Sequence, residues 1–152
     1  MGAFYHVKGD QTLTTALTTA LTVGSNASTA QRNFIIMFEL STALTPSDSQ
    51  FTFTGQRCSA LGTSTAKTPG LMDPADRAAQ AACGSNHTAE PTYTANAVFY
   101  DTQFNNARTT FVWNLHPGQR LTHAATVGAG LGWQALHASR TEDFVVGAWW
   151  DE

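Results

Sequence analysis

Charge is scarce in this sequence. Asp, Glu, Lys and Arg make up 12% of the 152 residues, about half of the roughly 25% that is usual in soluble domains. The net charge is −3, and the eight basic residues are scattered along the chain. Proteins that bind a phosphate backbone need a clustered excess of Lys and Arg. We therefore expect no nucleic-acid partner.

Long apolar runs are also missing. The longest are residues 34–38 and 144–150, far short of the roughly 20 residues that a membrane-spanning helix needs. Residues 1–6 lack the basic start and the apolar segment of a secretory signal. We therefore expect a protein that has no membrane partner.

Cysteine and paired histidine are rare. The only cysteines, Cys58 and Cys83, permit one disulfide without requiring it, and in a cytosolic protein they are more often reduced and buried. The five histidines form no His-x-His or His-x-x-x-His pair that would present two imidazoles to one ion. Cys58, Cys83 and His87 could supply three ligands, but zinc sites usually have paired spacings. We expect no metal and no cofactor.

Catalytic motifs are absent too. The sequence has no Gly-x-Ser-x-Gly string, and the glycines of residues 128–132 lack the ending of a phosphate loop, so they predict a turn entering a strand. Helix capping, a loop and a terminus account for the neighbouring acids, Asp73/Asp76, Glu142/Asp143 and Asp151/Glu152. We predict that the protein is not an enzyme.

Threonine and alanine dominate what is present, with 23 of each. Threonine is β-branched and suits a pleated, half-exposed strand face. In residues 34–41, successive side chains point to alternate faces, and one of these faces is entirely apolar. In residues 51–54, aromatic side chains alternate with threonines. The predicted fold is all-β: a single-domain, jelly-roll-like β-sandwich of about eight strands.

Further strands are predicted in the second half of the chain. Residues 93–103 and 108–115 should form a hairpin, because Asn105-Asn106 between them tolerates the left-handed conformation of tight turns. Three more predicted strands cover residues 120–126, 131–137 and 143–150.

Two segments depart from this pattern. Leucine and alanine in residues 10–23 have helical spacing, but the interleaved threonines disfavour a helix, so we predict an extended segment. Residues 1–24 are thus an extended N-terminal arm with the first strand, and residues 25–152 are the sandwich domain. Asp73 and Pro74 can begin a helix that the following alanines continue and Gly84 ends, which predicts one short helix near residues 73–83.

Consecutive aromatics stand near both ends of the sequence, at Phe4-Tyr5 and Trp149-Trp150. Alternation along a strand leaves one of the two tryptophans outside the core unless a neighbour covers it. The pair either completes the protein's own core or docks onto a partner, and the sequence leaves both readings open.

Read as a whole, the chain resembles the small β-sandwich decoration, or cement, proteins of tailed-bacteriophage capsids. The resemblance covers most of the chain and lies in the Thr/Ala-rich N-terminal segment and in three strings, residues 7–13, 71–76 and 86–93.

The resemblance implies a structural virion protein, made in the host cytoplasm, that binds the exterior of an assembled capsid and stabilises contacts between capsomers. Its expected partners are the major capsid protein and, in a homotrimer, two further copies. The predicted contact residues are Phe4, Tyr5, Leu13, Leu17, Leu71, Met72, Trp149 and Trp150. On this hypothesis, removing residues 1–12 should leave the sandwich folded.

Two other functions stay open. A carbohydrate-binding sandwich of a phage adhesin or fibre head would stack exposed Trp or Tyr on sugar rings, so Trp150→Ala should abolish glycan binding. A hydrolase on a jelly-roll scaffold would need two acids that converge in a cleft.

Overall fold

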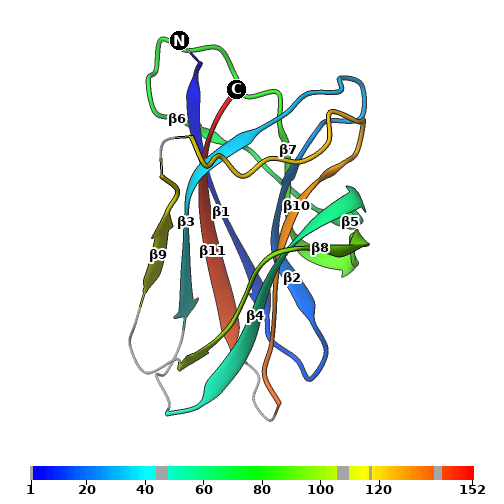
Figure 1. The fold of residues 1–152 in the computed structure, drawn as a ribbon, viewed down its shortest axis with the longest axis vertical. Coiled ribbons are helices and arrows are strands. Elements are labelled where there is room, and N and C mark those ends of the chain that lie inside the picture. Colours follow the sequence, from blue (N-terminus) through cyan, green and yellow to red (C-terminus); the bar gives the residue numbers. More distant parts are fainter. Residues whose placement is uncertain (1, 44–47, 106–109, 117, 139–141) are drawn as a thin grey trace.

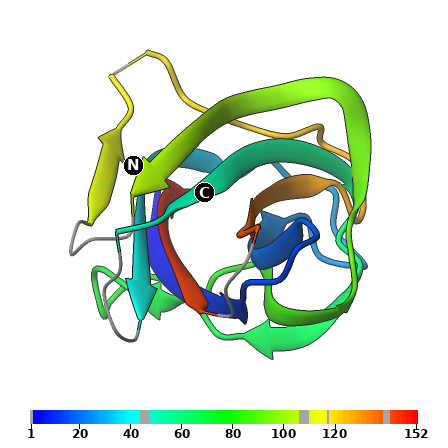
Figure 2. The ribbon, with the colours of Figure 1, turned by 90° about the horizontal axis from the view of Figure 1, so that it is seen from below.

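The computed structural model describes residues 2–43, 48–105, 110–116, 118–138 and 142–152. In these residues the protein is all-β, and two antiparallel sheets pack face to face as a sandwich (Figures 1 and 2). This confirms the predicted β-sandwich. The strands are β1 (Phe4–Thr12), β2 (Thr18–Gly24), β3 (Phe34–Ala43), β4 (Gln50–Ala60), β5 (Thr63–Lys67), β6 (Gly70–Leu71), β7 (Ala82–Ala89), β8 (Thr92–Asn105), β9 (Phe111–Asn114), β10 (Gly130–Leu136) and β11 (Asp143–Asp151).

The two sheets draw strands from both halves of the chain. Sheet A has the order β6-β1-β11-β3-β9, and sheet B has the order β5-β7-β2-β10-β4-β8. The first and last strands pair along their whole lengths, from Phe4 opposite Asp151 to Thr12 opposite Asp143. Both termini therefore lie at the same end of the molecule (Figure 1).

The core lies between the sheets and is strongly aromatic. Phe38 of sheet A packs against Phe53 and Trp133 of sheet B, with ring centroids 6.3 and 5.9 Å apart. Burying a large apolar side chain of this kind contributes about 1.5–3 kcal/mol relative to leaving it exposed. The side chains with the largest volume among the fully buried ones are Trp133, Trp150, Tyr5, Phe38, Phe53 and Phe144.

Strong alternation predicted strands well, but it did not predict their pairing. β3, β4, β10 and β11 form where the pattern places strands. The predicted hairpin of residues 93–103 and 108–115 is wrong, because β8 pairs with β4 in sheet B while β9 pairs with β3 in sheet A. Asn106 of its predicted turn lies outside the described residues. Residues 120–126 form no strand, and only Leu121 makes an isolated bridge, to Ile35.

The predicted N-terminal arm is also wrong. Residues 4–24 supply β1 and β2, and each strand lies between two neighbours in its own sheet. Tyr5 and Leu21 are completely buried. The extended conformation was predicted correctly, but this segment belongs to the sandwich, and it contributes a strand to each sheet.

No helix forms at residues 73–83. The Asp73 backbone carbonyl accepts a hydrogen bond from the Asp76 amide at 3.0 Å, and its carboxylate accepts one from Ala75 at 2.9 Å. This is a single tight turn. The amides of Gln80 and Ala81 then donate to the Glu152 carboxylate at 3.0 and 2.9 Å, and β7 begins at Ala82. Tertiary hydrogen bonds thus replace the helical ladder, because helix propensity contributes only a few tenths of a kcal/mol per residue.

Candidate functional site

The outward side chains of β1 trace one continuous surface. Every second residue, from Phe4 through His6 and Lys8 to Asp10, points away from the core, while Tyr5, Val7 and Gly9 are buried. On neighbouring β11, the same face carries Trp149 opposite His6 and Val145 opposite Asp10. We call this surface the outer face of sheet A. It changes along its length from apolar to charged.

The apolar end lies where the short strand β6 pairs with β1. Tyr5 is opposite Leu71, and the Met72 amide donates to the Phe4 carbonyl at 3.0 Å. Phe4, Leu71 and Met72 have exposed fractions of 40%, 40% and 59%. We name these three residues the edge patch. Exposed apolar side chains that cluster in this way are typical of contact surfaces.

An aromatic pair follows the edge patch along the sheet. The rings of His6 and Trp149 stack with centroids 4.2 Å apart. Burial lowers the pKa of His6, and nearby Lys8 lowers it further, while the Glu39 carboxylate opposes them. His6 is therefore held toward its neutral form, and a neutral ring leaves this part of the face without a fixed positive charge.

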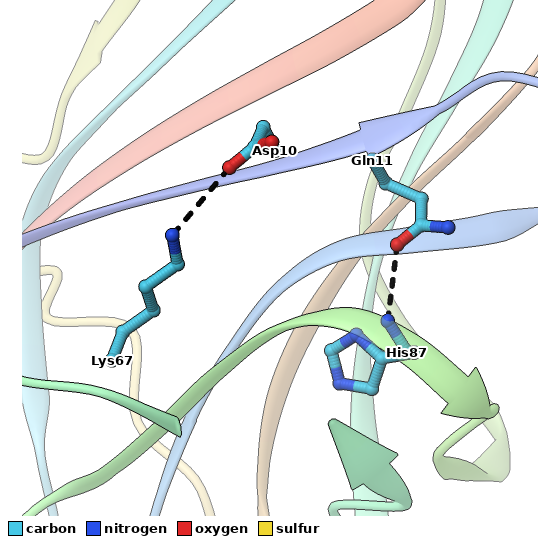
Figure 3. Close-up of polar contacts among 4 residues, drawn as sticks. All are labelled: Asp10, Gln11, Lys67 and His87. Atoms are coloured by element: carbon cyan, nitrogen blue, oxygen red, sulfur yellow. Dashed lines mark hydrogen bonds and ion pairs between the residues drawn. The ribbon is translucent and has the colours of Figure 1, made fainter. Parts of the chain in front are cut away.

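The charged end of the outer face is hollow. A cavity of about 400 Å³ is lined by Lys8, Asp10, Ala43, Lys67, Asp143 and Val145. Lys67 Nζ, from β5 of sheet B, lies 3.6 Å from Asp10 Oδ1, and Figure 3 shows it reaching across to β1. Beside this ion pair, Gln11 Oε1 accepts a hydrogen bond from the His87 amide at 3.0 Å. These contacts hold β5 and β7 against β1.

The predicted contact residues fall into two groups. Phe4, Leu71 and Met72 all lie where β6 pairs with β1, and Trp149 lies half-buried on the outer face of sheet A. Leu17 is 39% exposed, but it lies in the connection from β1 to β2, at the end of β1 that is far from Phe4. The structure assigns a different role to Tyr5, Leu13 and Trp150, because their fully buried side chains belong to the core.

Sequence reasoning missed the residues of the charged cavity. Lys8 and Asp10 occupy alternate positions of one strand, so a signal for a shared face was present in the sequence. Asp143 begins β11, as the predicted strand 143–150 required, but the Glu142/Asp143 pair was assigned to a loop without a role; Asp143 accepts a hydrogen bond from Thr12 Oγ1 at 2.8 Å. No local pattern could have placed Lys67 here, because its position depends on how the two sheets pack.

A second cavity, of about 250 Å³, lies over sheet B. Its lining includes Arg57, Cys58, Thr94, Ala97 and His123. Burial raises the pKa of the Cys58 thiol to about 12, so at neutral pH it is protonated and unsuited to nucleophilic attack. Cys58 and Cys83 are both free and buried.

No protein-family model, curated protein or solved structure matches this chain. Within the described ranges, no three His, Cys, Asp or Glu side chains gather as a metal-binding group would require. In the same residues, no helix has the length and apolar character that crossing a bilayer demands.

Proposed function

We propose that this protein is a structural virion component that binds the exterior of an assembled phage capsid and stabilises contacts between capsomers. The edge patch is the observation that carries the proposal. Phe4, Leu71 and Met72 place exposed apolar area on the rim of a sheet, where a flat protein surface can cover it. The proposed role is non-catalytic, with the major capsid protein as partner and a homotrimer as the binding form.

We also propose that the sandwich is a jelly roll, and the strand order supports this. β5, β6 and β7 form an insertion between β4 and β8. Without them, one sheet contains the first, last, third and sixth strands, in the order β1-β11-β3-β9. The other contains the second, seventh, fourth and fifth, in the order β2-β10-β4-β8. Eight strands divided between two sheets in this order fit a jelly roll of two Greek keys.

The mechanism of stabilisation is mass action. A protein that binds only the assembled lattice adds its binding free energy to the stability of that lattice, about 2.7 kcal/mol per site at a concentration 100 times Kd. Repetition over many equivalent sites makes a modest affinity sufficient.

Co-sedimentation tests the proposal, with capsids that lack this protein as bait. Met72→Asp places a charge in the edge patch and should weaken capsid binding at least tenfold, because a carboxylate is costly to bury without a partner. Val127→Asp is the matched control, since Val127 is 47% exposed outside the edge patch, and it should bind like the wild type. Wild-type protein that fails to co-sediment, or undiminished binding by Met72→Asp, would contradict the proposal.

The second candidate is a carbohydrate-binding sandwich of a phage adhesin or fibre head. The half-buried Trp149 ring on the outer face favours it, because aromatic faces stack on sugars. Since Trp150 is fully buried, the informative variant is Trp149→Ala. Loss of glycan binding in Trp149→Ala, and not in Val127→Ala, would support this function.

A further inference from the structure

Both lysines of the chain line one cavity. Lys8 and Lys67 are the only lysines in 152 residues, and they come from different sheets, on β1 and β5. With Asp10 and Asp143 they line the 400 Å³ hollow at the charged end of the outer face. In a chain with only 12% charged residues, this concentration of charge requires an explanation.

A purely structural role explains only part of it. The ion pair between Lys67 and Asp10 links the two sheets, but its side chains are 33% and 52% exposed. Such exposed pairs contribute only about 0–1 kcal/mol. Asp143 is held by Thr12, and in the described residues no ion pair engages Lys8. Lys8 and Asp143 therefore add one positive and one negative charge to the cavity, and the ion pair between Lys67 and Asp10 does not account for them.

The balance of charge defines the chemistry of a ligand. Two ammonium groups and two carboxylates give the cavity no net charge, so a ligand with a single sign of charge meets repulsion as well as attraction. A hydroxyl group can donate to a carboxylate and also accept from an ammonium group. Val145 and Ala43 supply an apolar part of the lining that suits the C–H face of a sugar ring.

We propose that this cavity binds a neutral saccharide, with its hydroxyl groups bridging Lys8, Lys67, Asp10 and Asp143. The inference deepens the carbohydrate-binding candidate and rests on no part of the capsid proposal. It assigns recognition to the charged cavity, whereas the sequence pointed to exposed Trp or Tyr.

The surface beside the cavity can take more than one sugar unit. Outward positions on a strand are about 7 Å apart, and on β11 the positions after Val145 are Gly147 and Trp149. Gly147 has no side chain, and the Glu39 side chain lies across it, with Cγ 2.8 Å from where a Cβ would be. A short oligosaccharide in the cavity would thus extend past Glu39 toward the Trp149 ring.

The lysine count makes a direct experiment available. Reductive ¹³C-methylation keeps the positive charge and labels only Lys8, Lys67 and the α-amino group, so two side-chain NMR signals report on the cavity. An array of neutral oligosaccharides, built from hexoses and N-acetylhexosamines, selects the probe for titration of labelled and unlabelled protein. Both lysine signals should shift with saturation, and the α-amino signal should not.

Two variants test the assignment. Asp143→Asn and Lys67→Met should each weaken binding of that oligosaccharide at least tenfold while leaving the thermal unfolding midpoint close to that of the wild type. Asp101→Asn is the control, because Asp101 is an exposed acid on β8 of sheet B, and it should bind normally.

Other outcomes would overturn the inference. Saccharide binding that both cavity variants retain would place recognition elsewhere and leave the carbohydrate-binding candidate intact. An array without binders, or lysine signals that shift with glycine or inorganic phosphate alone, would reject a saccharide in this cavity. These saccharide experiments do not measure capsid binding, so the co-sedimentation assay tests the capsid proposal independently.

Discussion

His123 shows how a single residue ties stability to pH. Its Nε2 lies 3.4 Å from the backbone nitrogen of Asn33, which can only donate, so Nε2 must accept. The proton is then on Nδ1, which donates to the Ala124 carbonyl at 2.8 Å. Burial lowers the pKa of His123, the Ala124 carbonyl opposes this, and Arg32 and Arg57 lower it further. Protonation would turn Nε2 into a donor that faces another donor.

The pH dependence follows from this lowered pKa. Since the unfolded chain has the ordinary value of 6.5, it binds more protons than the folded protein in the window below that pH. The stabilisation is therefore complete above pH 6.5 and is lost as the pH falls through the lower folded pKa. The expected slope is at most about 1.4 kcal/mol per pH unit for one proton.

Urea unfolding between pH 7.5 and 4.5 checks this prediction. His123→Gln removes the titrating ring but keeps an acceptor, so the free energy of unfolding should fall less steeply with acid than in the wild type. His116→Gln is the control, because the His116 side chain is exposed. Identical slopes in His123→Gln and the wild type would show that His123 does not carry the effect.

The terminal tryptophans illustrate what a residue pattern can predict. Alternation required one ring to point inward and one outward, and the structure places Trp150 in the core and Trp149 against His6. It did not say which ring is which. Trp150 shares the inward side of β11 with the fully buried Phe144, Val146 and Ala148, so the choice depends on which face of β11 packs against sheet B.

At the scale of elements, residues 73–83 show where local preference fails. The alanine run has strong helix propensity, but propensity differences amount to only a few tenths of a kcal/mol per residue. In the fold, Tyr5 Oη donates to the Arg77 carbonyl at 2.9 Å, and Glu152 receives the Gln80 and Ala81 amides. Contacts with residues about 70 positions away decide the conformation of this segment.

Deleting residues 1–12 should unfold the protein. The deletion removes β1, which pairs with β11 along nine residues and supplies the buried Tyr5 and Val7 to the core. Losing two such side chains and one strand exceeds the 5–15 kcal/mol by which domains are usually stable. Circular dichroism should show no cooperative thermal transition.

A chain shortened by residues 1 and 2 is the control for this deletion, since it keeps β1 whole and should melt cooperatively. A folded sandwich after removal of residues 1–12 would restore the N-terminal arm that the sequence predicted.

At the scale of the whole molecule, residues 1–24 and 25–152 should unfold together. β1 lies in sheet A and β2 in sheet B, so the first segment holds strands in both layers and cannot detach without disrupting each. Strand content from far-UV circular dichroism and the fluorescence of the buried Trp133 and Trp150 should follow one urea transition. Two separated transitions would mean that the segments are independent units.

The sequence by itself determined the fold class and the location of its strongest strands. Alternation in residues 34–41 and 143–150 is a local property of a pleated chain with one buried face, so neighbouring residues suffice to reveal it.

Only the tertiary structure decided how these parts combine. It paired β1 with β11, separated β8 from β9, and carried Lys67 across to Asp10. Each of these outcomes depends on side chains far apart in sequence that meet when two sheets pack. Packing free energy between layers therefore determined the connections and the charged cavity, which no local pattern encodes.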